Sequence, residues 1–319
     1  MSKRLHPLSS LLRAAVSLAA AALAAIALAA PPGALPALNI AIEDTSVSGI
    51  SSGGFMSVQM QVANASIIRG AGVVAGGPYY CAQDSVLTAT TACSCTGAPT
   101  LACKVGADST DVPALAAATR AFHTEGQIDD PAHLGRQRVL TVVGGKDPLV
   151  PAPVTRQLHG YYAAMGLPAA QLKAVTLADA GHTMPTVAYG GACAATDEPY
   201  IGKCGFDTAQ AILDWIYGPD VAPPRSAPQP QGRFVAFDQT RYLPATGFFS
   251  YLWGTGLDKS GWVYIPPACA AGERCRLHVV FHGCKQGQSF LPLRPPPEGG
   301  LYNGTTFVRN TGYDRWADT

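Results

Sequence analysis

An α/β fold built on a largely parallel sheet is the fold class that the sequence predicts, and its pattern of apolar runs is the main reason. Short apolar runs typical of buried strands alternate with stretches whose apolar residues recur at helical spacing. Glycine-rich or polar loops follow several of the strand-like runs directly. The 319 residues, of which 48% are hydrophobic, can bury a large core. We therefore expect an α/β domain whose site lies on the loops that follow its strands.

Residues 1–30 are predicted to be a secretory signal peptide and not part of this fold. Lys3, Arg4 and Arg13 precede an apolar run over residues 14–30, which ends in small residues suited to cleavage. An uncleaved membrane anchor is the alternative, but the run is short for a spanning helix. The protein is therefore expected to be secreted, to the periplasm or outside the cell, without stable membrane insertion after cleavage.

Nine cysteines agree with export, because disulfides persist in oxidising compartments. Short sequence separations predict the bridges Cys193–Cys204 and Cys269–Cys275, and Cys284 is left over. Zinc binding is the alternative, but the spacing of Cys93-x-Cys95 is not that of the usual zinc ligands and no His-x-x-x-His pair accompanies these cysteines. Two further bridges, whose pairing the spacing leaves open, are expected among Cys81, Cys93, Cys95 and Cys103.

A candidate nucleophile lies in the pattern G-x-S-x-G at residues 49–53, with Ser51 at its centre. A strand is expected over residues 39–47, a helix over 54–68 and a further strand over 71–75. Strand, turn, helix and strand is the order of a nucleophile elbow, in which a sharp turn lifts the serine hydroxyl out of the sheet. The helix would also point its free N–H groups and positive dipole end at that side chain. A Gly/Ser turn without a catalytic role is the alternative.

A candidate acid and a candidate base follow two later strands. Strands expected over residues 138–143 and 172–177 end in loops that carry Asp147 and His182, and a helix over 153–165 joins them. Because the carboxyl ends of parallel strands meet at one edge of a sheet, these two side chains are expected to lie close together. Histidine titrates near neutrality, so His182 can serve as the base of a serine nucleophile.

Other residues compete for these roles. Asp179 is the alternative acid, but it lies on the same loop as His182 and only three residues before it, so Asp147 is preferred. Histidines expected to serve only in packing or at the surface are His123, His133, His159 and His278.

The order of the remaining segments predicts a rearranged α/β-hydrolase fold. Helices are expected over residues 112–122 and 206–217, followed by a proline-rich connector over 218–231 and by strands over 261–265 and 276–281. A His-Gly turn after the last strand has the usual place of an oxyanion loop, which normally precedes the nucleophile in sequence. Here it follows the nucleophile. The expected fold is therefore a circularly permuted α/β-hydrolase, with the nucleophile near the mature N-terminus and the oxyanion loop near the C-terminus, in one catalytic domain over residues 31–319.

Together these residues resemble the catalytic domain of secreted poly(3-hydroxybutyrate) depolymerases of the circularly permuted type. The resemblance implies a serine esterase with Ser51 as nucleophile, His182 as general base and Asp147 as the partner that orients it. The backbone N–H groups of Ser52 and Cys284 would form the oxyanion hole. The motifs that carry the resemblance lie at residues 49–55, 145–150, 180–185, 278–286 and 311–318.

The resemblance also implies what the enzyme would act on. Its substrate would be a short-chain hydroxyalkanoate polyester or its oligomers, cleaved through an acyl-enzyme by a monomer that needs no metal or organic cofactor. The net charge of +1 and the lack of a basic cluster after the leader argue against a nucleic-acid partner. Two other functions stay open: a carboxylesterase acting on feruloyl or acetyl groups of plant polysaccharide, and a non-catalytic truncated paralogue that binds polyester.

Two features depart from the family pattern. Members usually continue past the Trp-Ala-Asp motif at residues 316–318 with a strand and a Gly-Cys-Trp segment, so the C-terminal end and a partner for Cys284 are expected to be missing. A proline-rich insertion over residues 291–300 is expected to alter access to the oxyanion loop. Aromatic residues that either line a polymer groove or pack in the core are Tyr79, Tyr80, Tyr189, Phe248, Phe249 and Trp253.

Overall fold

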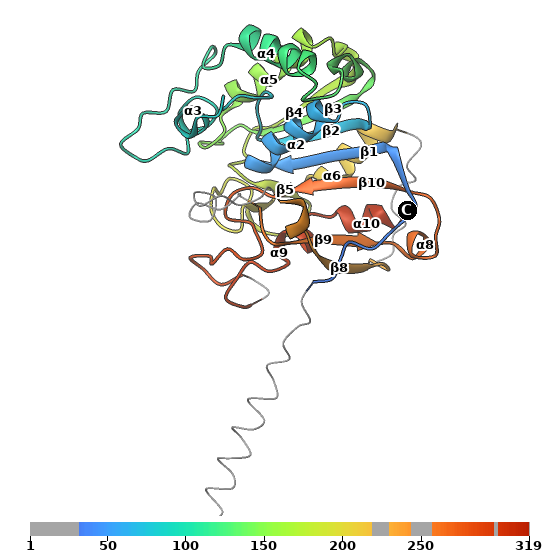
Figure 1. Ribbon diagram of the computed structural model, residues 1–319. Coiled ribbons are helices and arrows are strands. Elements are labelled where there is room, and N and C mark those ends of the chain that lie inside the picture. Colours follow the sequence, from blue (N-terminus) through green and yellow to red (C-terminus); the bar gives the residue numbers. More distant parts are fainter. Residues whose placement is uncertain (1–31, 219–229, 244–256, 297–298, 319) are drawn as a thin grey trace, which may run out of the picture.

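The structure, a computed structural model, describes residues 32–218, 230–243, 257–296 and 299–318. At its centre lies a five-stranded parallel sheet with the strand order β10-β1-β2-β3-β4 (Figure 1). The predicted α/β class is confirmed, while the predicted signal peptide lies outside the described residues. The five strands are β1 (Ile40–Ile50), β2 (Ile68–Val74), β3 (Arg138–Gly144), β4 (Leu172–Leu177) and β10 (Cys275–Phe281).

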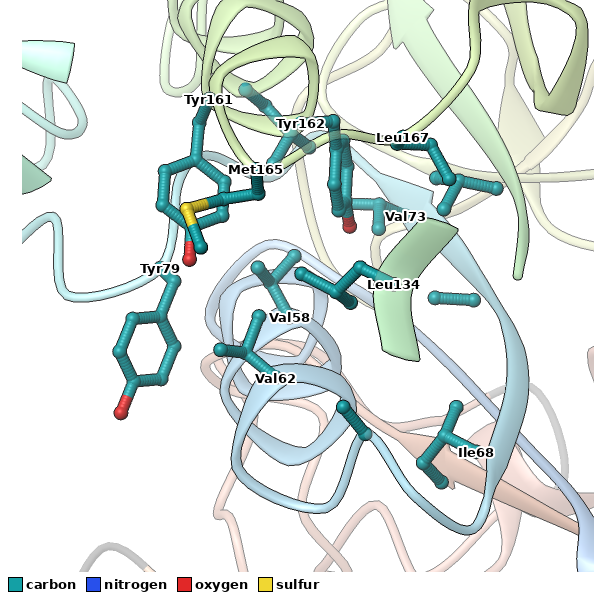
Figure 2. Close-up of a cluster of buried hydrophobic side chains, with 14 of the residues drawn as sticks. Val58, Val62, Ile68, Val73, Tyr79, Leu134, Tyr161, Tyr162, Met165 and Leu167 are labelled. Atoms are coloured by element: carbon teal, nitrogen blue, oxygen red, sulfur yellow. The ribbon is translucent and has the colours of Figure 1, made fainter. Parts of the chain in front are cut away.

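One face of the sheet is covered by three helices: α2 (Ser52–Ala63), α4 (Val112–Thr124) and α5 (Ala152–Ala164). Their buried side chains form a cluster with residues of the sheet, including Val139 and also Val73, which Figure 2 labels. Two neighbouring tyrosines of α5 lie within this cluster (Figure 2). Burial of such side chains contributes about 1.5–3 kcal/mol each to folding, so this layer fixes α2 on the sheet.

The opposite face carries α6 (Thr208–Tyr217), α9 (Thr306–Asn310) and α10 (Tyr313–Ala317). The next residues along β2 and β3, Val74 and Leu140, belong to the cluster on this side. Successive side chains of a strand point to opposite faces, so strands that are apolar throughout can support a helix layer on each side. The continuous apolar runs of the sequence have this cause.

A second, two-stranded antiparallel sheet pairs β8 (Arg233–Asp238) with β9 (Ser260–Ile265). The strand predicted over residues 261–265 is confirmed as β9, but it pairs with β8 and not with the main sheet. Strand β8 was not predicted from the sequence. All its residues after the first are half-buried, so the strand lacks the alternation that marks a half-buried strand. Residues 219–229 of the proline-rich connector lie outside the described residues.

The helix α2 ends earlier than the sequence pattern predicts. The pattern continues to Ile68, but the structure ends the helix at Ala63 and caps it at Asn64, whose N–H donates to the carbonyl oxygen of Met60. Ile68 is buried as the first residue of β2, where it pairs with Thr45 of β1. An apolar side chain at helical spacing can serve a following strand equally well, so the pattern did not reveal the boundary.

Short elements connect these layers. Within the described residues, no helix has both the length and the apolar character needed to cross a membrane. A small sheet follows the loop of His182 and contains β5 (Met184–Thr186), β7 (Ile201–Lys203) and β6 (Gly191–Ala192). The other short helices are α3 (Val86–Thr91), α8 (Pro267–Ala270) and the 3-10 turns Pro131–Arg136, Ala169–Gln171 and Thr240–Tyr242.

Four disulfides tie the loops together. The predicted bridges Cys193–Cys204 and Cys269–Cys275 are confirmed. Cys284 is free and exposed. The pairings that the sequence left open are Cys81–Cys93 and Cys95–Cys103.

Three of the six aromatic residues singled out in the sequence lie among the described residues, and they serve in packing. Tyr79 is buried in the cluster of Figure 2. Tyr80 is half-buried against the same cluster, and Tyr189 against the one on the opposite face. The remaining three, which lie outside the described residues, are Phe248, Phe249 and Trp253.

Candidate active site

Ser51 occupies a strained turn between β1 and α2, at the carboxyl end of β1, which lies between β10 and β2 in the sheet. Its backbone has φ 58° and ψ −126°, a combination that residues other than glycine rarely adopt. Its N–H donates to the carbonyl oxygen of Val74 at 2.9 Å, which fixes the turn to β2. Its side chain makes no capping bond to α2. The hydroxyl is thus held at a sharp turn without being used to cap the helix.

Glycines on both sides of Ser51 allow this turn. A Cβ atom at Gly49 would overlap the carbonyl oxygen of Gly53. One at Gly53 would overlap the carbonyl oxygens of Phe281 and His282, at the end of β10. The pattern G-x-S-x-G therefore has a steric origin here, because the first turn of α2 packs directly against the backbone of two strands.

Asp147 and His182 follow the adjacent strands β3 and β4 and form a buried hydrogen-bonded pair. His182 Nδ1 lies 2.8 Å from Asp147 Oδ2, and the two side chains are 5% and 0% exposed. The other carboxylate oxygen, Oδ1, accepts the N–H groups of Leu149 and Val150 at 2.8 Å each. The carboxylate is thus fully engaged, and it holds the imidazole by Nδ1 so that Nε2 remains for other chemistry.

The loops that carry this pair lie directly against each other. A Cβ atom at Gly144 would lie 2.5 Å from the carbonyl oxygen of Ala180, so only glycine fits at the end of β3. The N–H of Lys146 donates to that same oxygen at 2.9 Å. On the far side, Thr196 Oγ1 accepts the N–H of His182 at 2.8 Å. The backbone on both sides of the imidazole is therefore fixed.

The competing acid, Asp179, has a different partner. It forms an ion pair of 2.7 Å with Lys146, and its side chain is 84% exposed. The hydrogen bond from Lys146 lowers the pKa of Asp179 below its ordinary value. The carboxylate in contact with His182 is that of Asp147.

The other histidines of the described residues lie apart from this pair. His278 is half-buried in β10, where its ring nitrogens contact the hydroxyls of Ser46 and Ser48 at 2.6 and 2.8 Å. Burial lowers its pKa to about 3, so the ring is neutral near pH 7. His159 contacts Thr141 Oγ1 at 2.9 Å, and burial lowers its pKa as well.

The loop after β10 packs against Ser51. A Cβ atom at Gly283 would lie 3.1 Å from the Cβ of Ser51. The thiol of Cys284 donates to Ser52 Oγ at 3.3 Å, so the two residues predicted to supply oxyanion N–H groups are neighbours. His282 Nδ1 lies 2.8 Å from the carbonyl oxygen of Gly283. Because the peptide between Gly283 and Cys284 is planar and trans, the N–H of Cys284 points away from the carbonyl oxygen of Gly283. Within the described residues no acceptor takes this N–H.

Ser51 and His182 are not joined by a hydrogen bond within the described residues. The structure thus brings Asp147 and His182 into direct contact, and places Ser51 beside the loop after β10. Catalytic hydrogen bonds are often long without substrate and tighten when it binds. No group of three or more His, Cys, Asp or Glu side chains in the described part of the chain could hold a metal ion.

Two neighbours of this site were not predicted from the sequence. The ring of Tyr200 lies edge-on to that of His182, with centroids 6.1 Å apart. Gln286 bonds to the backbone of the Tyr200 segment. The motif at residues 278–286 was the only sequence signal that pointed to Gln286. No sequence pattern pointed to Tyr200.

Comparison with known proteins gives relatives that share most of this chain. No protein-family model matches it. It is 39% identical over 290 residues to poly(3-hydroxybutyrate) depolymerase of Delftia acidovorans, across 89% of this chain and 52% of that protein. It is 34% identical over 291 residues to polyhydroxybutyrate depolymerase of Talaromyces funiculosus, across 90% of this chain and 74% of that protein. The chain therefore spans about half the length of the first relative and about three quarters of the second.

Solved structures of similar proteins agree. A crystal structure of PHB depolymerase from Penicillium funiculosum superposes with a TM-score of 0.72 at 32% identity, covering 90% of this chain and 79% of that one. A serine-to-alanine variant of PHB depolymerase complexed with an R3HB trimer gives a TM-score of 0.71 at 32% identity, with the same coverage. Sequence and structure give the same result, and the chain belongs to the poly(3-hydroxybutyrate) depolymerase family.

Proposed function

We propose that this protein is a secreted serine esterase that hydrolyses ester bonds of poly(3-hydroxybutyrate)-type short-chain polyester or its oligomers. The observation that carries the proposal is the buried pair of His182 and Asp147, at the same sheet edge as the strained turn of Ser51. Family membership supports the same chemistry, and the related structure that holds an R3HB trimer supports an oligomer as substrate.

In the proposed mechanism, Ser51 Oγ attacks the ester carbonyl carbon while His182 Nε2 takes the hydroxyl proton. Asp147 keeps the remaining ring proton on Nδ1 and stabilises the imidazolium that forms. The tetrahedral intermediate collapses as the imidazolium gives its proton to the leaving alkoxide, which departs as the hydroxyl end of the polymer. Water, activated by the same imidazole, then attacks the acyl-enzyme and releases a carboxylate. The steps need no metal or organic cofactor.

The backbone N–H groups of Ser52 and Cys284 are proposed to bind the oxyanion of that intermediate. The first belongs to the opening turn of α2, where N–H groups lack intrahelical acceptors and the helix dipole favours negative charge. The contact of Cys284 with Ser52 and the unpartnered amide described above support the second. Removal of one such donor typically costs about 10²–10³-fold in kcat.

We further propose that the fold is an α/β-hydrolase with permuted chain order, in a single catalytic domain over residues 31–319. The strand before the oxyanion loop, β10, lies next to the nucleophile strand β1 in the sheet but follows it in sequence. The core clusters on the two faces share this one sheet, which supports one domain. A monomer is the proposed working form.

Secretion is proposed from the predicted signal peptide over residues 1–30 and from the four disulfides, which are typical of oxidising compartments. The proposed partner of the secreted protein is a polyester polymer or oligomer. Neither a nucleic-acid partner nor stable membrane insertion is part of the proposal.

Substitution of Ser51 by Ala tests the proposal. We expect release of 3-hydroxybutyrate from amorphous polymer and from R3HB trimer to fall by at least about 10⁴-fold, because the hydroxyl forms the acyl-enzyme. Retained turnover in the folded variant contradicts the mechanism.

The same wild-type preparation separates the other functions. Greater release of ferulate or acetate from plant polysaccharide would identify a carboxylesterase of that class. Co-sedimentation with polyester granules, without soluble product and without labelling of Ser51 by an organophosphonate, would identify a binding protein.

A further inference from the structure

Gln286 is a buried polar side chain next to the site, and the mechanism above gives it no role. It ends the motif at residues 278–286 and is 4% exposed. A buried amide is costly unless its oxygen and its N–H groups find partners. Both ends of the Gln286 amide do find partners, and these partners belong to two different loops.

The amide oxygen holds the oxyanion loop. Gln286 Oε1 accepts the N–H of Gly283 at 2.7 Å. The carbonyl oxygen of Gly283 contacts His282 Nδ1 at 2.8 Å. The peptide units before and after Gly283 are both fixed in this way. The second of them carries the Cys284 N–H, so its direction is set by these bonds.

The amide nitrogen holds the segment that packs on the base. Gln286 Nε2 donates to the carbonyl oxygens of Pro199 and Tyr200 at 3.0 and 3.1 Å. The Tyr200 oxygen also accepts the N–H of Met184, two residues after His182, at 2.8 Å. The ring of Tyr200 lies against the ring of His182.

We propose that Gln286 is a positioning residue that couples the oxyanion loop to the loop of the catalytic base. The amide oxygen holds the N–H of Gly283, one peptide before the Cys284 donor, and the amide nitrogen holds the segment that packs on His182. The inference rests on the proposed function, because it requires an oxyanion at Ser51. Only an amide supplies an acceptor at one end and two donors at the other, so leucine and glutamate each lose a defined part of the coupling.

Two variants measure this coupling, with 4-nitrophenyl butyrate as a soluble ester. For Gln286→Leu, which frees both loops, we expect kcat to fall about 10- to 100-fold with KM within about threefold, since a misplaced oxyanion donor weakens mainly the transition state. For Gln286→Glu, which keeps the acceptor for Gly283 but loses the amide donors, we expect a smaller loss. Its kcat relative to wild type should rise as pH falls, because a protonated carboxyl restores one donor.

A boronic acid provides a readout that a purely structural role would not change. Its adduct with Ser51 is tetrahedral and places an oxygen in the oxyanion hole, so its affinity should fall in proportion to kcat and not to KM. This second measurement separates a displaced donor from a general loss of folded protein.

The matched control is Gln157→Leu. Gln157 is 5% exposed, and its amide nitrogen donates to the carbonyl oxygens of Gly106 and Ala107 at 2.7 and 3.1 Å. Its loss removes a comparable set of buried bonds without contact to either catalytic loop. We expect a lower melting temperature and an unchanged kcat for the folded fraction.

The outcomes separate this inference from the proposed function. Turnover by Ser51→Ala would refute the function itself. The coupling alone would be overturned if Ser51→Ala is inactive while Gln286→Leu keeps wild-type kcat and boronate affinity. An effect of Gln286→Leu on KM only would overturn it as well. If Gln286→Leu does not fold, Gln286→Glu decides by the same two measurements.

Discussion

Replacement of Asp147 by Asn is the sharpest test of the proposed base, because the structure dictates how the new amide must lie. Asp147 Oδ1 accepts two backbone N–H groups, from Leu149 and Val150. The oxygen of the asparagine must take that place, and its NH₂ group then faces His182 Nδ1. A donor at that position requires Nδ1 to be unprotonated, so the ring proton moves to Nε2. With that tautomer, His182 cannot accept the proton of Ser51.

The size of the effect follows from the alternative orientation. If the amide rotated to keep the productive tautomer, its NH₂ would face the two N–H donors. Two buried donors would then lose their acceptor, at a cost of about 1–3 kcal/mol each. The productive form would therefore lie about 2–6 kcal/mol above the unproductive one, which corresponds to roughly 30- to 10⁴-fold in kcat. Size and shape are unchanged, so we expect little change in KM or melting temperature.

The assay is initial-rate hydrolysis of 4-nitrophenyl butyrate, with thermal unfolding as the check on folding. Asp179→Asn is the matched control, because its ion pair with Lys146 is solvent-exposed, contributes little to stability, and has no contact with His182. It should keep wild-type kcat. If Asp147→Asn kept more than about a tenth of wild-type kcat, or if Asp179→Asn lost activity instead, the assignment of the acid would be wrong.

Three further predictions concern the scaffold of the site. Burial lowers the pKa of His278 to about 3, whereas the pKa in the unfolded chain is about 6.5, so the stability that the neutral ring contributes is complete above pH 6.5 and declines as pH falls toward 3. Urea unfolding should show about 3 kcal/mol less stability at pH 4 than above pH 6.5, and His278→Gln should lose less stability over the same range. Gly53→Ala should lower kcat by more than the loss of folded protein explains, because the new Cβ would meet the Phe281 carbonyl and push α2 away from β10. The test compares kcat with the melting temperature, and a wild-type kcat would refute the prediction. Replacement of Cys193 and Cys204 by alanine should lower the melting temperature and kcat together, since the loop that this bridge closes fixes the backbone of His182 through Thr196. Full activity of the variant at 25 °C would show that the loop keeps its position without the disulfide.

Much of the candidate site could be predicted from local sequence, because its parts depend on local geometry. Gly49 and Gly53 are needed at a turn too tight for any side chain, and this need is visible as a spacing. Asp147 and His182 each follow a short apolar run, and parallel strands bring their carboxyl ends to one edge. The hydrogen bond between them is the consequence of that rule. The pairing of four clustered cysteines was not predictable, since their spacings allow several loops of similar length.

Residues close together in the chain specify the α/β class, the turn of Ser51, and the loops that carry Asp147 and His182, because strand and turn patterns depend on neighbouring residues. Contacts between distant segments set what surrounds these features. Cys284 reaches Ser52 across 232 residues of sequence because β10 lies beside β1 in the sheet. The bonds of Gln286 to the Tyr200 segment, and the pairing of β8 with β9, depend in the same way on how distant segments pack. No local pattern specifies a partner so far along the chain, and the packing of the whole core selects it.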